Sequence, residues 1–312
     1  MHESDRTQDR WAAWLLSRRQ GGDATQREAM WQRMARWRDR VLDNAQVQPG
    51  DSVLDVGCGD GLIALGALDR VGPSGQVIFS DISQELLDHC AELARELGHA
   101  GQCDFIRASA DDLVPLADAS VDVVTTRSVL IFVAAKQVAF QEFFRVLRPG
   151  GRVSIFEPIS RFVHPEPPSR FFGYDVMPVQ DLAQKLRAAY ARSESSAIES
   201  MIDFDERDLL HYTEQAGFHE VQMDAHFAVI ASPESLLSAP GGGDAFPVKM
   251  PWDAFVRSAP SPLSPTLEEA MAAAFMPDEA ERFTAHLRPL VESMHMVHRM
   301  EHVYLWAVKY GS

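Results

Sequence analysis

Residues 53–61 read VLDVGCGDG, an apolar strand that runs into a glycine-rich turn. The strand ends in Asp55 and Val56, and glycines follow at positions 57, 59 and 61. Such glycines let backbone N–H groups approach a ligand closely at the start of the next helix. A dinucleotide fingerprint would need glycine or alanine at position 62, which is leucine. Asp55 would repel a pyrophosphate, so the turn indicates a cationic ligand.

Two further acidic positions narrow the ligand. Asp81 stands twenty residues after Gly61, at the end of the next predicted strand, where an acid chelates ribose hydroxyls. Ser109, Ala110 and Asp111 follow the third predicted strand, where a short polar pair can read an adenine edge. A positively charged nucleoside without phosphate fits all three positions. The obvious candidate is S-adenosylmethionine.

Strand and helix patterns alternate between residues 51 and 157. Apolar strand-like runs occur at Ser52–Val56, Gln76–Ser80, Asp104–Arg107, Val121–Thr126 and Arg152–Phe156. Helix-like runs occur at Leu62–Arg70, Gln84–Leu97 and Ala134–Leu147. This alternation predicts an α/β fold with a parallel sheet covered on both faces. Such sheets bind ligands outside the carboxyl ends of their strands.

Four sequence blocks resemble the core of class I S-adenosylmethionine-dependent methyltransferases. They are LDVGCGDG at 54–61, FSDIS at 79–83, SADDLVPLADASVDVV at 109–124 and FRVLRPGGRVSIFEP at 144–158. The resemblance implies a Rossmann-like, mostly parallel sheet of seven strands. It also implies S-adenosylmethionine as the cofactor and a small-molecule methyl acceptor, as in bacterial specialised-metabolism enzymes.

The resemblance also implies a set of cofactor-binding residues. They are Asp55, Val56, Gly57, Cys58, Gly59, Asp81, Ile82, Ala110, Asp111, Arg127 and Ser128. Asp55, Gly57 and Gly59 would line the methionine part, Asp81 would hold the ribose, and Ala110 with Asp111 would flank the adenine. Arg127 would bind the methionine carboxylate or an anionic group on the acceptor. A surface arginine in an ion pair is the alternative.

The remaining chain divides into an N-terminal segment and two insertions. Residues 1–48 predict amphipathic helices, whose tryptophans either pack on the body or cover a ligand cleft. Residues 49–157, 204–230 and 301–312 form the predicted cofactor-binding core. The insertions 158–203 and 231–300 predict a helical lid. Outside 51–157, the expected helices are 181–201, Asp205–Ala216, 266–274 and 278–298, the expected strands are Glu220–Ile230 and His302–Lys309, and 231–265 reads as a loop.

Three residues near the predicted ligand edge are candidate catalytic bases. Glu157, His164 and Tyr174 could each deprotonate an acceptor hydroxyl or amine, or serve only the structure. A histidine set at 295, 298 and 302 is expected on one face of the last helix or just after it. It lacks an H-E-x-x-H pattern or a carboxylate in register, so no metal site is predicted.

Charge excludes several partners. The chain carries 29 Lys+Arg and 45 Asp+Glu, a net charge of −16. This balance argues against nucleic acid and anionic membranes as partners. No apolar run approaches the length of a membrane span, no signal peptide is visible, and three cysteines suit a reducing cytoplasm. A cytoplasmic enzyme is expected, with a homodimer left open.

The expected reaction is in-line transfer of a methyl group to an O, N or C nucleophile of an apolar or aromatic metabolite, in a biosynthetic role. One alternative is a different reaction on the same fold, such as cyclisation, cyclopropane formation or decarboxylation. A non-catalytic cofactor-binding module is the second alternative. A macromolecular substrate is a third, and the acidic charge opposes it.

Overall fold

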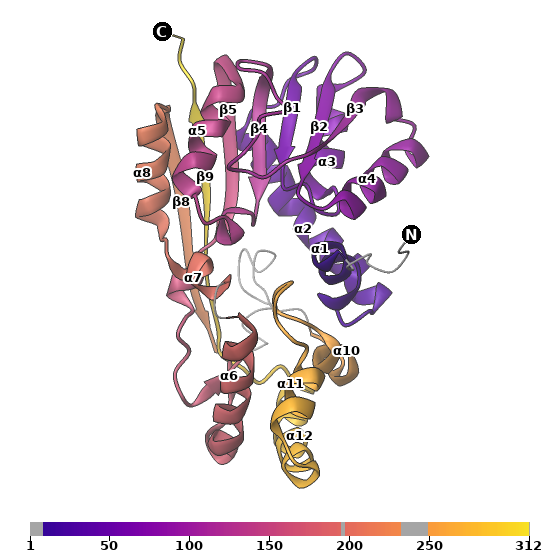
Figure 1. Ribbon diagram of the computed structural model, residues 1–312, viewed down its shortest axis with the longest axis vertical. Helices are drawn as coiled ribbons and strands as arrows, with labels where there is room; N and C mark the ends of the chain where they lie inside the picture. The colour runs from indigo at the N-terminus through magenta and orange to yellow at the C-terminus, as the bar shows by residue number, and fades with distance from the viewer. Residues whose placement is uncertain (1–8, 195–196, 232–248, 312) are drawn as a thin grey trace, which may run out of the picture.

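A seven-stranded sheet forms the centre of the molecule (Figure 1). The computed structural model describes residues 9–194, 197–231 and 249–311. The strands lie in the order β3-β2-β1-β4-β5-β9-β8; β1 to β5 run parallel, and β9 is antiparallel to β5 and β8. Their bounds are β1 (Ser52–Val56), β2 (Gln76–Asp81), β3 (Cys103–Arg107), β4 (Val121–Arg127), β5 (Leu147–Pro158), β8 (His219–Ile230) and β9 (His298–Val308). The prediction of a mostly parallel Rossmann-like sheet is confirmed.

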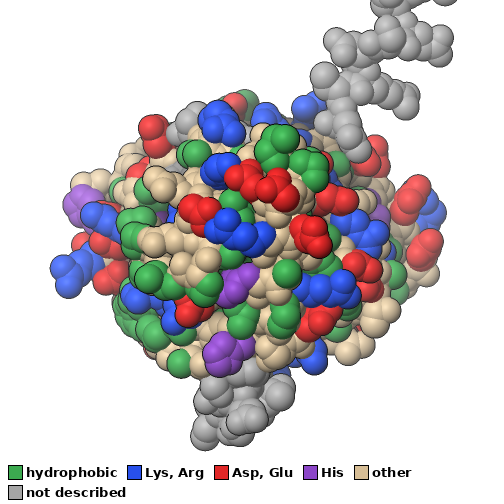
Figure 2. Space-filling view, turned by 90° about the horizontal axis from the view of Figure 1, so that it is seen from below, with side chains coloured by type: hydrophobic (Ala, Val, Ile, Leu, Met, Phe, Trp, Pro, Cys, Tyr) green, Lys and Arg blue, Asp and Glu red, His purple; other side chains and the backbone are tan. Residues whose placement is uncertain are grey.

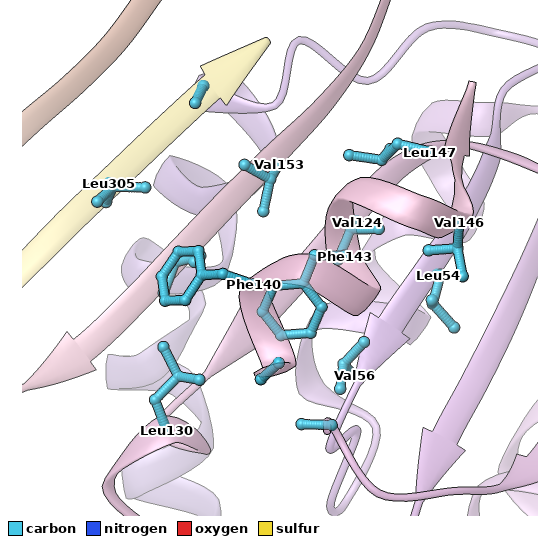
Figure 3. Packing of buried hydrophobic residues seen from close by; sticks show 14 of the residues in the cluster. Leu54, Val56, Val124, Leu130, Phe140, Phe143, Val146, Leu147, Val153 and Leu305 are labelled. Carbon is cyan, nitrogen blue, oxygen red and sulfur yellow. The ribbon is translucent and has the colours of Figure 1, made fainter. Parts of the chain in front are cut away.

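Helices cover both faces of this sheet because its strands alternate apolar side chains between them. Val53 faces a core with α2 (Ala24–Asn44), α3 (Leu62–Val71) and α4 (Gln84–Glu96). Leu54 and Val56 face the opposite core with α5 (Lys136–Val146) and α8 (Glu206–Ala216). Figure 3 shows Phe140 and Phe143 of α5 lying over the sheet residues of this second core. The two apolar layers fix the strands, and therefore the edge at which they end.

A smaller body lies below the sheet in Figure 1. It comprises β6 (Arg170–Phe171), β7 (Tyr174–Asp175), α6 (Gln180–Glu194), α10 (Trp252–Arg257), α11 (Leu267–Ala274) and α12 (Pro277–Glu292). These elements share an aromatic core that includes Phe171, Tyr174 and Phe283. Figure 2 views the molecule from this end and shows acidic and basic side chains interspersed on its surface. No helix among the described residues has the length and apolar character needed to span a membrane.

The helix expected over 278–298 ends earlier than predicted. It was expected to continue to residue 298, but α12 stops at Glu292, and Met294 adopts a left-handed φ of 55°. His298 and His302 therefore lie on β9, and the prediction that His295, His298 and His302 share a helical face is wrong. The ring of His302 packs against Phe156 instead, with centroids 5.2 Å apart.

Two other predictions need correction. The helix expected over 181–201 is two helices, α6 and α7 (Ala197–Ile202). Residues 252–257, expected within a loop, form α10. Residues 232–248 of the expected loop 231–265 lie outside the described residues.

Candidate cofactor site

A cavity of about 360 Å³ opens at the carboxyl edge of β1, β2 and β4. This edge contains the switch point of the strand order, between β1 and β4, where α/β sheets bind ligands. The cavity wall includes the predicted residues Asp55, Gly57, Cys58, Gly59, Asp81, Ile82, Ala110, Asp111, Arg127 and Ser128. Val56 is the exception, since it is buried in the sheet core. The sequence prediction thus gathered residues from four separate segments that do lie together.

The glycine turn approaches the opposite wall closely. Gly57 has a left-handed φ of 66°, and a Cβ built there would lie 2.3 Å from Cγ2 of Val129. The N–H of Cys58 donates to the carbonyl of Ser80 at 2.9 Å, which ties the turn to β2. Any side chain at position 57 would therefore displace either the turn or the loop after β4.

Asp81 closes the turn from the end of β2. Its Oδ2 accepts from the N–H of Gly59 at 3.0 Å, and its Oδ1 accepts from the N–H of Ser83 at 2.9 Å. Burial raises the pKa of this carboxyl. Each carboxylate oxygen can accept more than one hydrogen bond, so Asp81 keeps acceptor capacity toward the cavity. A ribose diol is a suitable donor pair for it.

Both carboxylate oxygens of Asp55 accept hydrogen bonds from the protein itself, which its sequence position did not indicate. It faces Thr125 across the β1–β4 register; Oδ1 accepts from the hydroxyl of Thr125 at 2.8 Å, and Oδ2 accepts from the N–H of Ala64 at 3.1 Å. Burial raises its pKa to about 7. Asp55 thus joins two strands to the first turn of α3, and its negative charge is only partly present at neutral pH.

The first N-terminal helical segment forms one wall of the cavity. The sequence alone did not decide between this role and packing on the body. Trp11, Trp14, Leu15 and Arg19 line the cavity, from α1 (Arg10–Ala13) and the π-helical turn η1 (Trp14–Arg18). The indole N–H of Trp14 donates to the carbonyl of Ala259 at 2.8 Å. Of the two alternatives for these tryptophans, covering a ligand cleft describes Trp11 and Trp14.

The tryptophans of α2 pack on the body, as the other alternative states. Trp37 stacks on Phe156 with ring centroids 4.8 Å apart. Trp31 donates its indole N–H to Oδ2 of Asp60 at 2.8 Å, just behind the glycine turn. The helix-compatible spacing in the sequence did not distinguish the two groups.

Residues 29–234 match the model of the ubiE/COQ5 methyltransferase family. The chain belongs to this family. The match begins within α2, spans the parallel strands β1 to β5, the insertion 158–203, α8 and β8, and ends at residue 234. S-adenosylmethionine is the cofactor of this class of enzyme, and the acceptor capacity of Asp81 beside the glycine turn fits it.

Curated relatives match part of the chain. The ubiquinone/menaquinone biosynthesis C-methyltransferase UbiE of Haemophilus ducreyi is 32% identical over 149 residues, which is 46% of this chain and 55% of the relative. UbiE of Ectopseudomonas mendocina is 35% identical over 121 residues, covering 39% and 47%. The chain thus spans about half the length of these relatives.

Solved structures agree on the fold. The [4+2]-cyclase SpnF has a TM-score of 0.51 at 21% identity, with 89% of this chain and 81% of that chain covered. The YcgJ protein of Bacillus subtilis has a TM-score of 0.52 at 18% identity, covering 88% and 98%. At these identities the likeness concerns architecture alone.

None of the three candidate bases lines the cavity of this ubiE/COQ5-family chain. Glu157 is fully buried, and its Oε1 accepts from the N–H groups of Val129 and Leu130 at 2.7 and 2.9 Å. His164 is exposed beyond β5. Tyr174 lies in the aromatic core of the smaller body. Glu157 therefore positions the loop after β4, in which Val129 lines the cavity.

Glu157 gives the folded chain a distinctive pH dependence. Burial raises its pKa to about 7, well above an unfolded glutamate near 4.5. Between these values the unfolded chain releases a proton that the folded chain keeps, so this residue makes stability fall as pH rises. Glu157→Gln keeps the Oε1 acceptor and removes the ionisation. We expect it to match wild type at pH 4 and to exceed it at pH 7.5 by about 3 kcal/mol, at 1.36 kcal/mol per pKa unit.

Urea unfolding at both pH values measures this difference. The matched control is Glu142→Gln on α5, whose pKa is lowered by its hydrogen bond to Arg145. Its folded pKa lies below the unfolded value, so the control should lose stability relative to wild type as pH rises. A Glu157→Gln difference that does not change between pH 4 and 7.5 would contradict the assignment.

Proposed function

We propose that this chain transfers the methyl group of S-adenosylmethionine to an O, N or C nucleophile of a small aromatic or apolar metabolite. One observation carries the proposal. A single cavity joins the glycine turn and Asp81 at one side to the aromatic side chains of Trp11, Trp14 and Phe132 at another. The first set suits a charged nucleoside, and the second suits a flat apolar ring.

The cofactor contacts that we propose follow the cavity wall. Asp81 accepts from the ribose hydroxyls, and Ala110 with Asp111 flanks the adenine. The hydroxyl of Ser109 donates to Asp111, which fixes that carboxylate. Arg127, at the end of β4, binds the methionine carboxylate through its guanidinium fork. The backbone of the turn at 57–59 approaches the methionine part, because Gly57 and Gly59 have no side chain.

S-adenosylmethionine supplies, when bound, a methyl group already activated by its sulfonium. The protein's contribution is therefore to position the acceptor and exclude water. Trp11 lies edge-to-face against Phe132, with ring centroids 4.9 Å apart, and Trp14 lies 6.4 Å from the same ring. We propose that this aromatic wall shields the acceptor from water. His164 and Tyr174 lie away from it, so we propose neither as the base.

The names of the UbiE relatives favour an aromatic acceptor. They are named as C-methyltransferases of ubiquinone/menaquinone biosynthesis. We propose that the two insertions, 158–203 and 231–300, adapt this core to its own acceptor. Pro158, Met201 and Pro260 reach the cavity from them.

Asp81→Ala tests the cofactor site. Calorimetry of wild type should give micromolar dissociation constants for S-adenosylmethionine and S-adenosylhomocysteine. The variant should bind both about thirtyfold more weakly, because it loses charge-assisted hydrogen bonds to two hydroxyls. Asp104→Ala removes an exposed carboxylate of the adjacent strand and should leave both constants unchanged. Equal affinity of the Asp81→Ala variant and wild type would contradict the proposal.

Product mass separates methyl transfer from the other reactions of this fold. A structural neighbour is named as a [4+2]-cyclase. Methyl transfer adds one CH₂ unit to the acceptor and releases S-adenosylhomocysteine, whereas a cyclisation leaves the substrate mass unchanged. A product of unchanged mass would overturn the proposed reaction while leaving the cofactor site intact.

A further inference from the structure

Two arginines line the same cavity. Arg127 ends β4, and Arg19 follows the π-helical turn η1 of the N-terminal segment. The N–H of Arg19 donates to the carbonyl of Trp14, five residues back, at 2.8 Å. This wider turn changes the direction of the next side chain relative to a regular helix, and π-turns occur often at functional sites. The cavity wall therefore contains a second guanidinium, that of Arg19, in addition to that of Arg127.

Neither guanidinium has a hydrogen-bonded acid. Among the described residues, no ion pair or side-chain hydrogen bond involves Arg19 or Arg127, although Arg19 lies 5.1 Å from the ring centre of Trp14. The acid that most attracts both is Asp60, whose Oδ2 already accepts from Trp31. Burial lowers the pKa of both arginines, that of Arg19 to about 10, and the charge of Arg127 lowers it further. Both therefore stay cationic at neutral pH and repel each other.

The proposed cofactor neutralises only one of them. S-adenosylmethionine carries a single carboxylate, which one guanidinium fork can bind in a bidentate manner. Its ammonium and sulfonium groups add positive charge to the same cavity. The nearby acids Asp55 and Glu157 have pKa values of about 7, so they are only partly ionised at neutral pH and offset only part of this positive charge. Both guanidinium groups are partly exposed in the cavity wall and lack a hydrogen-bonded acid among the described residues, so a second anion would be stabilised there.

We propose that Arg19 binds a carboxylate of the methyl acceptor, which makes the acceptor an aromatic acid. Arg19 comes from the same segment as Trp11 and Trp14, so ring and carboxylate would be recognised together. A planar guanidinium fork suits a planar carboxylate. This inference rests on the proposed function and adds the substrate class.

The test uses benzoate and its neutral isostere benzamide. The full chain is first saturated with S-adenosylhomocysteine, and each probe is then titrated while the tryptophan fluorescence is followed. We expect benzoate to bind at least about tenfold more tightly than benzamide, as a charge-assisted bidentate pair allows. In Arg19→Gln this preference should fall below about twofold. Arg19→Lys should retain an intermediate preference, since it keeps the charge and loses the fork.

Two matched variants complete the experiment. Arg10→Gln removes an exposed arginine of the same segment and should leave the preference unchanged. Arg127→Gln should weaken S-adenosylhomocysteine about tenfold. Equal binding of benzoate and benzamide, or a preference that survives in a folded Arg19→Gln, overturns the inference. So does an Arg19→Gln variant that loses as much S-adenosylhomocysteine affinity as Arg127→Gln does. Failure of wild type to bind S-adenosylhomocysteine would overturn the proposed function instead.

Discussion

Gly57→Ala is expected to weaken S-adenosylhomocysteine binding at least about a hundredfold and to lower the free energy of unfolding by about 3 kcal/mol. The backbone strain comes first: φ is 66°, and a left-handed conformation costs a residue with a Cβ about 1–2 kcal/mol. The new methyl would also lie 2.3 Å from Cγ2 and 3.1 Å from Cγ1 of Val129. Relieving such overpacking costs about 1–3 kcal/mol more.

Gly57→Ala should affect ligand binding more than stability, because the loop that holds Val129 is fixed and cannot move away from the new methyl group. The N–H of Val129 donates to buried Glu157 at 2.7 Å, and the next N–H, of Leu130, donates to the same oxygen. The turn therefore moves instead, and the N–H of Gly59 leaves Asp81 with it. Both the backbone approach and the ribose acceptor are displaced together, so binding suffers more than stability.

Matched variants separate strain from the clash. Gly72→Ala also has a positive φ, 62° with ψ −172°, but no heavy atom lies within 4 Å of its Cβ. It should lose about 1–3 kcal/mol from backbone strain alone and bind normally. In Gly57→Ala/Val129→Ala the nearest remaining side-chain atom is Cβ of residue 129, 3.3 Å away, and part of the lost affinity should return. Urea unfolding and calorimetry measure both quantities. Equal binding by Gly57→Ala and Gly72→Ala would contradict the close-approach argument.

The local parts of the site were predictable from the sequence. The turn at 57–61, Asp81 and Asp111 stand at or shortly after the ends of predicted strands, so their positions at the carboxyl edge follow from the fold class. Glycine and aspartate also indicate their roles by their residue types. Their grouping at one edge could therefore be predicted without knowing strand register or side-chain burial.

Long-range contacts account for the rest. Trp14 reaches the carbonyl of Ala259, a contact between positions 245 residues apart, and no local pattern encodes it. Arg19 points into the cavity because of a π-turn, whereas a regular helical periodicity would place it differently. The end of α12 was missed because no glycine or proline marks it; Met294 takes the left-handed conformation instead. Glu157 was expected near the chemistry, and its burial against the Val129 loop emerges only from packing.

Lys136→Met is expected to lower the free energy of unfolding by about 4 kcal/mol. Lys136 begins α5 and is 3% exposed. Its ammonium donates to the carbonyls of Val133 and Ser200 at 2.9 and 2.8 Å and to Oδ1 of Asp203 at 2.6 Å. Methionine fills a similar volume but leaves these acceptors without their donor. Asp203 is half-exposed and can bind water instead, but each of the two carbonyls loses a charged donor at a cost of about 1–3 kcal/mol.

The same contacts connect Lys136 to the cavity, so the variant should also bind S-adenosylhomocysteine several-fold more weakly. Val133 and Met201 are wall residues, and Lys136 holds the backbone beside each of them. The matched control is Lys185→Met, which breaks a half-exposed ion pair with Glu279 on the smaller body. An exposed pair contributes at most about 1 kcal/mol, so this control should be nearly silent in unfolding and in calorimetry. Equal losses of stability in the two lysine variants would contradict this assignment. Lys136 would then contribute no more than an exposed lysine, and other residues would have to hold the loop after β4.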